Sequence, residues 1–224
     1  MINELSKRVI SSVILLPLVF VLIIKGSLYF DFLIFISFLI VSYEWHIMSK
    51  KKKYYIFGYA YLIFSFLTVY FLRNNFPGDY AYFLFIIMIC IFTDLGGYIF
   101  GKIFKGPKLT KISPNKTYSG MIGSYIVTMI FMIFSIYNLD FFKFINMNID
   151  EKGLFANYLI LILLVSTASQ LGDIIISYFK RMSKIKDTGK IIPGHGGLLD
   201  RIDGMIFAFP FAYLILSLNI FNYF

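Results

Sequence analysis

The sequence contains few charged residues and a single cysteine. Charged residues make up 15% of the 224 residues, whereas soluble domains average about a quarter. This shortage excludes an ordinary soluble domain. The abundance of aromatic residues, with 27 Phe and 17 Tyr, excludes a disordered chain. Because Cys90 is the one cysteine, an internal disulfide and a thiolate zinc cluster are also excluded.

Hydrophobic residues account for 59% of the chain and fall into seven runs. A membrane-spanning helix needs roughly 20 mostly apolar residues, and these runs come close to or reach that length. The first run is not a cleavable signal peptide, because Lys25 and Gly26 lead straight into the second. We therefore predict an all-α, polytopic integral membrane bundle of about seven transmembrane helices. The predicted spans are 9–24, 27–42, 54–72, 80–100, 121–138, 157–179 and 202–224.

The basic residues predict the orientation of the bundle. Of the 21 Lys and Arg residues, 17 lie at the N-terminus or in the connections after the second, fourth and sixth spans. Positively charged connections stay cytoplasmic, so the N-terminus is predicted to be cytoplasmic. Topology thus explains the net charge of +9, and no nucleic-acid partner is needed. The same rule places the connections after the second, fourth and sixth spans on the cytoplasmic side.

Two predicted cytoplasmic loops, 102–118 and 180–201, are longer than a helix connection requires and are rich in Gly, Pro, Lys and Ser. Loops of this kind usually carry function. We expect one integrated membrane domain, in which residues 1–93 form N-terminal transmembrane helices and residues 94–224 form the catalytic region. By contrast, Glu44 is expected only to extend toward the membrane surface from the end of the second span.

Acidic residues occur where lipid is expected. Asp94 and Asp173 lie inside apolar spans, roughly 10–12 Å from the predicted cytoplasmic edge at about 1.5 Å per residue. Ionisable residues within a span normally face a cavity or a partner. In the sixth span, polar residues also recur at steps of three and four, which places them on one helix face. They are Ser166, Ser169, Gln170, Asp173, Ser177 and Lys180.

Asp200 and Asp203 lie at i and i+3 and point to the same side of a helix start. One interpretation is helix capping. Capping explains one of the acids, but it does not explain why Arg201 lies between the two. The other is a cation site, because closely placed carboxylates repel each other without one. Oxygen ligands select a hard ion, so the expected metal is Mg²⁺.

The segment 193–197, Pro-Gly-His-Gly-Gly, has little side-chain cover, so its N–H groups can approach a phosphate. It is not a Walker loop, because no Gly-Lys-Ser/Thr ends it. His195 is left open as a base, a metal ligand or a hydrogen-bond donor within its loop. In the other loop, Ser113, Lys116 and Thr117 offer two hydroxyls and an ammonium for an anion, although an ordinary positive loop has a similar composition.

Residues 177–203 closely resemble the C-terminal signature of the phosphatidate cytidylyltransferase family, also called CDP-diacylglycerol synthases. The matching residues are Ser-Tyr-Phe-Lys-Arg, Lys-Asp-Thr-Gly and Pro-Gly-His-Gly-Gly-Leu-Leu-Asp-Arg-Ile-Asp. A weaker resemblance extends upstream through 94–98 and 113–120, where Ser119 stands in place of an acidic residue and Gly97 in place of a common alanine.

This resemblance implies a polytopic membrane enzyme that condenses CTP with phosphatidic acid to give CDP-diacylglycerol and pyrophosphate. It also implies Mg²⁺ as cofactor, and a second cation such as K⁺ is suggested for some members. A homodimer is compatible with the apolar surface.

The expected site residues follow from the resemblance together with the charge pattern. The predicted metal ligands are Asp173, Asp187, Asp200 and Asp203, with Asp94 as a second-tier candidate. The predicted catalytic residues are Asp187, Asp200, Lys180 and Arg201. The predicted substrate-binding residues are Ser113, Lys116, Thr117, Ser177, Arg181, Lys186, His195, Gly196 and Gly197.

Two other functions fit the sequence less well. A CDP-alcohol phosphotransferase needs Asp-Gly-x-x-Ala-Arg followed by spaced aspartates, but Asp203-Gly204 is followed by Met-Ile-Phe-Ala and no further aspartate. A cation-coupled membrane transporter also uses acids within the membrane. It predicts polar residues across the full depth of the bundle, whereas here they are concentrated toward one side.

Overall fold

The computed structural model describes residues 4–76, 80–138, 152–192, 194 and 196–218, and His195 lies outside this set. The described residues form α-helices and two isolated β-bridges, with no β-strand among them. The helices are α1 Glu4–Lys25, α2 Ser27–Ser49, α3 Tyr55–Asn74, α4 Ala81–Phe104, α5 Tyr118–Asn138, α7 Lys152–Met182, α8 Leu199–Ile202 and α9 Met205–Ser217.

Each of the seven predicted spans coincides with a helix. Helices α2, α3, α4, α5 and α7 are long and apolar enough to cross a membrane, while Val13–Lys25 of α1 and Met205–Ser217 of α9 are shorter apolar segments. The prediction of a polytopic helical membrane protein is confirmed. The start of the last predicted span differs, because α8 and α9 are separated by Asp203 and Gly204. Residues 219–224 of that span lie outside the described residues.

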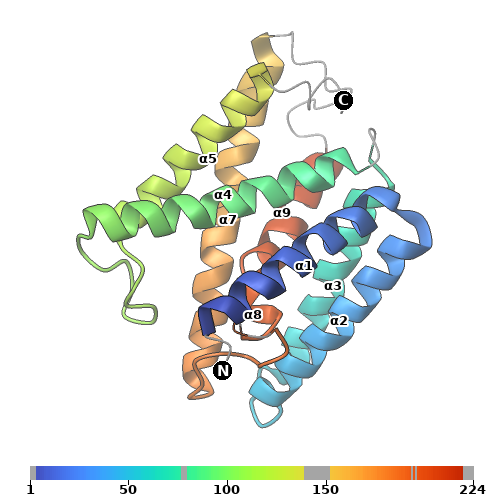
Figure 1. Cartoon of the computed structure of the whole chain (residues 1–224), viewed down its shortest axis with the longest axis vertical. Helices are drawn as coiled ribbons and strands as arrows, with labels where there is room; N and C mark the ends of the chain where they lie inside the picture. Colours follow the sequence, from blue (N-terminus) through green and yellow to red (C-terminus); the bar gives the residue numbers. More distant parts are fainter. Residues whose placement is uncertain (1–3, 77–79, 139–151, 193, 195, 219–224) are drawn as a thin grey trace.

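The helices bury one large hydrophobic core and a second, smaller one. In Figure 1, α1, α2 and α3 lie side by side, α4 runs across the bundle, and α5 and α7 stand on its other side. Helix α9 packs against both α3 and α7 and so joins the two halves. The large core contains buried side chains from seven of these helices, for example Ile23, Leu72, Phe85, Leu161 and Ala212.

Small residues allow α4 and α5 to approach closely. A Cβ atom added to Gly120 of α5 would lie only 2.8 Å from the carbonyl oxygen of Gly97 in α4, and one added to Gly96 would lie 2.6 Å from the carbonyl oxygen of Gly123. These small residues of α4 and α5 therefore make a close helix contact. It fixes the start of α5, and with it the preceding loop, beside Asp94.

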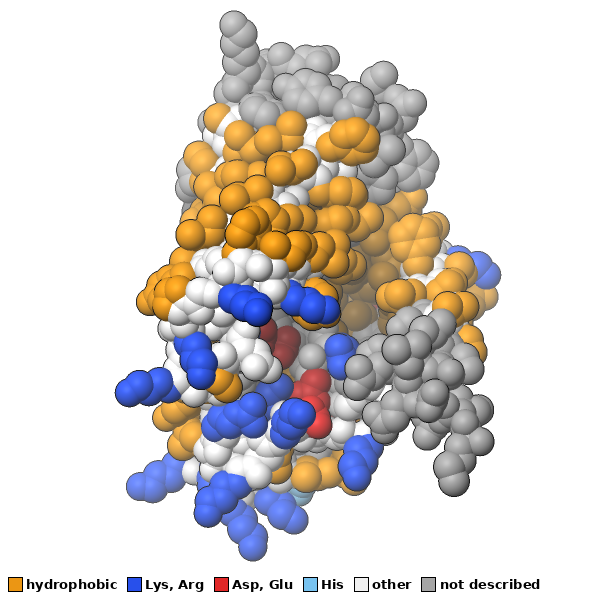
Figure 2. Space-filling model, turned by 60° about the vertical axis from the view of Figure 1, so that its left-hand side comes forward, with side chains coloured by type: hydrophobic (Ala, Val, Ile, Leu, Met, Phe, Trp, Pro, Cys, Tyr) orange, Lys and Arg blue, Asp and Glu red, His pale blue; other side chains and the backbone are white. Residues whose placement is uncertain are grey.

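Three helix connections meet at one end of the bundle. The Ser183 hydroxyl, just after α7, donates to the Met48 carbonyl at the end of α2 at 2.8 Å. The Arg181 guanidinium donates to the carbonyl of Ile112 in the α4–α5 connection at 3.5 Å. These are the three connections predicted to be cytoplasmic. Figure 2 shows Lys and Arg side chains gathered at this end, below a wide belt of apolar side chains, with acidic side chains in a hollow between them.

Candidate active site

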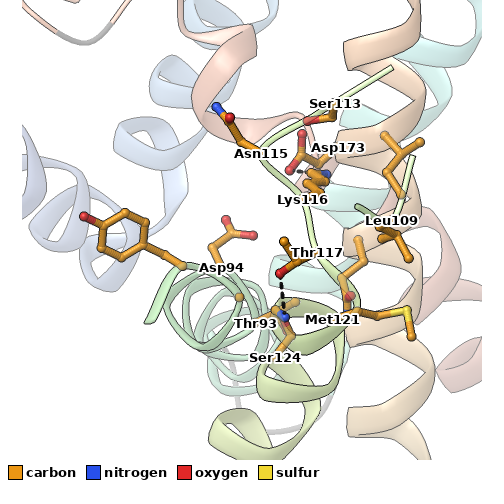
Figure 3. A pocket seen from close by; sticks show the side chains of 15 residues that line it. Thr93, Asp94, Leu109, Ser113, Asn115, Lys116, Thr117, Met121, Ser124 and Asp173 are labelled. Carbon is orange, nitrogen blue, oxygen red and sulfur yellow. Dashed lines mark hydrogen bonds and ion pairs between the residues drawn. The ribbon is translucent and has the colours of Figure 1, made fainter. Parts of the chain in front are cut away.

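A cavity of about 320 Å³ opens between α4, α5, α7 and the loop that precedes α5. Figure 3 shows Asp94 on one side of this cavity and Lys116 and Asp173 on the other. The polar stripe predicted on the sixth span reaches the cavity through Gln170 and Asp173. The remaining wall is partly apolar, including Met121 of α5.

Lys116 and Asp173 form an ion pair at the cavity wall. The Lys116 Nζ atom lies 2.5 Å from Asp173 Oδ2, and the two side chains keep 23% and 31% of their exposure. The Ser177 hydroxyl, one turn further along α7, donates to Asp173 Oδ1 at 3.3 Å. Asp173 also interacts electrostatically with Asp94 and with Asp203. Acids from α4 and α7 therefore meet at this cavity, and Asp203 at the α8–α9 junction interacts with both of them.

Thr117, predicted to bind substrate, caps a helix in the structure. Its hydroxyl oxygen accepts a hydrogen bond from the backbone N–H of Gly120 at 3.1 Å, the usual arrangement at the start of a helix. It also lies 3.0 Å from the hydroxyl of Ser119, which in turn donates to the carbonyl of Lys105. Thr117 and Ser113 both line the cavity. Thr117 therefore positions the loop that carries Lys116, and its place in the cavity wall is compatible with a contact to substrate as well.

Asp200 is the centre of a second cluster, beside the glycine-rich loop, the connection 183–198 between α7 and α8. Its Oδ1 atom lies 2.8 Å from Lys180 Nζ, and its Oδ2 atom accepts the backbone N–H groups of Thr188 at 2.8 Å and Gly197 at 3.1 Å. Burial by itself would raise the pKa of Asp200. The hydrogen bonds from Lys180, Thr188 and Gly197, with the lysine charge, outweigh it and hold the pKa below its ordinary value. Asp200 is therefore a carboxylate at neutral pH.

The glycine-rich loop brings a second aspartate next to Asp200. A Cβ atom added to Gly196, which has φ of +87°, would lie 3.1 Å from Asp200 Oδ2 and 3.9 Å from Asp187 Cγ. Both acids therefore flank Gly196. Gly196 and Gly197 were both predicted to bind substrate. The N–H of Gly197 already donates to Asp200, so this glycine stabilises the loop.

The remaining predicted residues differ in their surroundings. Arg181 donates to the carbonyl of Ile185 at 3.2 Å as well as to the α4–α5 connection, so it orders two loops. Lys186 and Arg201 have exposed side chains near the same loop. Asp203 Oδ1 accepts the N–H of its neighbour Gly204 at 2.8 Å.

The four predicted metal ligands are divided between the two clusters. Among the described residues, no group of three or more His, Cys, Asp or Glu side chains is close enough to hold a metal ion. A magnesium site does not require such a group, because Mg²⁺ is commonly held by one or two carboxylates together with substrate phosphates. The carboxylates of Asp94 and Asp173, which face one cavity, fit that donor set.

The sequence did not indicate the role of Glu44 in α2. Its side chain is 1% exposed. Its carboxylate accepts the Thr188 hydroxyl at 3.1 Å and the backbone N–H groups of Leu198 at 2.9 Å and Leu199 at 2.7 Å. The expectation that Glu44 extends to the membrane surface is wrong. In the sequence, an acid near the end of an apolar run looks the same whether it reaches the membrane surface or is buried. Only the fold shows that a loop packs against Glu44.

We expect Gly197→Ala to be strongly disruptive. The added Cβ would overlap the Thr188 hydroxyl and lie 2.7 Å from both carboxylate oxygens of Glu44. Overpacking of this kind costs about 1–3 kcal/mol, and here it also displaces the N–H that holds Asp200. The measurements are thermal unfolding in detergent and enzymatic turnover.

Gly101→Ala is the comparison, because its added Cβ would meet its nearest neighbour, Thr117 Oγ1, at 3.3 Å. It should be the milder of the two changes. If the two variants had the same unfolding temperature and the same turnover rate, close packing around Gly197 would be contradicted.

The fold and the site together define an integral membrane protein with a charged site at one end of its helical bundle. Residues 53–219 match the model of the Cytidylyltransferase family. The chain is 35% identical to the phosphatidate cytidylyltransferase of Staphylococcus haemolyticus over 82% of its own length and 68% of that protein. The corresponding enzymes of Staphylococcus saprophyticus and Staphylococcus aureus are 34% and 35% identical over the same shares.

The chain therefore belongs to the cytidylyltransferase family, as the signature at 177–203 indicated. Members of this family generally use a divalent metal.

Proposed function

We propose that this chain is a phosphatidate cytidylyltransferase, which condenses CTP with phosphatidic acid to CDP-diacylglycerol and pyrophosphate. The observation that carries the proposal is the cavity at one end of an apolar bundle, where a lysine and carboxylates from separate elements meet. Lysine neutralises phosphate charge. The surrounding apolar helices give a membrane lipid access to the same site. Membership of the cytidylyltransferase family supports the nucleotide half of the reaction.

The reaction forms one phosphorus–oxygen bond and breaks another. An oxygen of the lipid phosphate bonds to the α-phosphorus of CTP. The bond from the α-phosphorus to the oxygen bridging to the β-phosphorus breaks, and its electron pair leaves with pyrophosphate. A phosphate monoester is already an anionic nucleophile, so no strong general base is required, and we assign none to His195. The barrier lies mainly in bringing two anions together in the right orientation.

Lys116 and Lys180 are the side chains best placed to lower that barrier. Each is paired with an aspartate, at 2.5 Å from Asp173 and 2.8 Å from Asp200. A phosphate group competes well for an ammonium, so each lysine can exchange its carboxylate for a phosphate oxygen when substrate enters. We also propose contacts to substrate from Ser113, Ser177, Arg181, Lys186, Arg201 and Gly196.

We further propose that the divalent metal is Mg²⁺ and that Asp94 and Asp173 hold it in the cavity, with Asp187, Asp200 and Asp203 as additional candidate ligands. A carboxylate released by its lysine would be free to do so. Bound Mg²⁺ would neutralise the triphosphate and the leaving pyrophosphate. A second cation such as K⁺, a homodimer, and a location in the bacterial inner membrane with the site facing the cytoplasm complete the proposal.

The test is an assay of the purified protein in detergent with CTP and phosphatidic acid. We expect pyrophosphate release and CDP-diacylglycerol formation that stop when EDTA removes the metal and resume when Mg²⁺ is added. Diacylglycerol, which lacks the nucleophilic phosphate, is the matched control and should give no product. Absence of pyrophosphate release with phosphatidic acid, CTP and Mg²⁺ in a folded preparation would contradict the proposed function. Undiminished turnover in EDTA would contradict the metal requirement alone.

A further inference from the structure

We propose that Glu44 is a positioning residue that holds the glycine-rich loop in its active arrangement. This inference rests on the proposed function for its effect on turnover, but not for its structural basis. Glu44 belongs to α2, in the N-terminal helices, and the family model begins only at residue 53.

Glu44 contacts both ends of the loop. The Thr188 hydroxyl, near the start of the loop, and the N–H groups of Leu198 and Leu199, at its end, all donate to this carboxylate. The loop therefore closes around a single side chain supplied by a long membrane-spanning helix. Two carboxylate oxygens can satisfy all three donors at once, which a hydroxyl or a carbonyl group cannot do as well.

The same loop residues then hold Asp200. Thr188 donates its hydroxyl to Glu44 and its backbone N–H to Asp200, at 3.1 Å and 2.8 Å. Gly197 donates its N–H to Asp200 and lies directly before Leu198, which is bonded to Glu44. Asp200 in turn pairs with Lys180 at 2.8 Å. A continuous series of hydrogen bonds thus connects Glu44 to two predicted catalytic side chains.

The glycines of this segment are consistent with that role. A Cβ atom added to Gly189 would lie 2.6 Å from Glu44 Oε1, and one added to Gly197 would lie 2.7 Å from both oxygens. A side chain at either position would therefore crowd the carboxylate. The burial of Glu44 at 1% exposure also keeps it from substrate, so it acts through the loop rather than on the reacting atoms.

The experiment compares Glu44→Ala, Glu44→Asp and Thr188→Val with the wild type in two measurements. The first is hydrogen–deuterium exchange of the detergent-solubilised full chain, which needs no activity. The second is steady-state turnover with CTP and phosphatidic acid. Ser49→Ala is the matched control, because Ser49 is a buried polar residue of the same helix. Within the described part of the chain its hydroxyl bonds only to the Trp45 carbonyl of α2, at 2.6 Å.

For Glu44→Ala we expect faster hydrogen–deuterium exchange confined to residues 186–200. We also expect a kcat lower by roughly 10- to 100-fold, the effect typical of residues that orient the side chains of a site without touching the ligand. KM for CTP should change much less, because the loss is one of geometry. Glu44→Asp keeps the carboxylate and should recover part of kcat. Thr188→Val should show the same direction with a smaller loss, and it remains informative if Glu44→Ala fails to fold. Ser49→Ala should match the wild type, because a hydroxyl bonded to its own helix contributes little.

Unchanged exchange in residues 186–200 for both Glu44→Ala and Thr188→Val would overturn the inference. So would a kcat per folded molecule equal to that of the wild type. If the wild type itself transferred no cytidylyl group, the proposed function would fail while the exchange measurement still decided the structural role of Glu44.

Discussion

Asp200→Asn is expected to abolish measurable turnover while leaving the protein inserted and folded. The substitution keeps the shape of the side chain but removes the charge that pairs with Lys180 and places an NH₂ group against donors that Asp200 now accepts. Both side chains of the pair are about nine-tenths buried, at 11% and 8% exposure. If the transition state loses the same about 3–5 kcal/mol that breaking a buried pair costs, the rate falls by roughly a hundredfold to a few thousandfold.

Asp31→Asn makes the same chemical change on α2, near the predicted outer end of that helix, and is the control. It should retain turnover close to that of the wild type. Size-exclusion chromatography and helical circular dichroism check that each variant is folded. An Asp200→Asn protein with near-normal kcat would exclude Asp200 from the catalytic machinery.

Asp173→Asn is expected to cause the second large loss, by about a hundredfold or more, because one change removes two proposed functions. It releases the Lys116 ammonium, now 2.5 Å from the carboxylate, and it removes a candidate metal ligand facing the cavity. The two effects can be separated by titration. Loss of a ligand should raise the Mg²⁺ concentration needed for half-maximal turnover, and a misplaced lysine should raise KM for CTP.

Lys116→Met tests the second effect alone and should raise KM for CTP with little change in the Mg²⁺ requirement. If Asp173→Asn and Lys116→Met gave the same Mg²⁺ titration as the wild type, Asp173 would be a partner of the lysine and not a metal ligand. The cavity would then depend on Asp94 or on the second cluster for any metal it holds.

The two clusters of the site use the same arrangement. In each, a lysine and an aspartate from different parts of the chain neutralise each other at the end of the bundle where the basic connections gather. Such pairs hold the lysines in place before substrate arrives. A substrate with several phosphates can then exchange partners with both pairs without leaving an isolated charge in a partly buried site.

The sequence by itself determined the helices, because the free energy of placing a segment in a membrane depends mainly on its own composition. It also indicated the acids of the site, since Asp94 and Asp173 are conspicuous in apolar runs, and the signature at 177–203 identified the family.

The tertiary structure alone decided how the polar groups pair. Nothing near Glu44 in the sequence indicates that it holds a loop more than 140 residues away, or that Lys116 meets Asp173 and Lys180 meets Asp200. Likewise, Gly197 serves the packing of that loop, and Thr117 caps α5. The physical reason is that a hydrogen bond or an ion pair depends on where two side chains lie in space. Helix packing sets those positions, whereas hydropathy is a property of each segment.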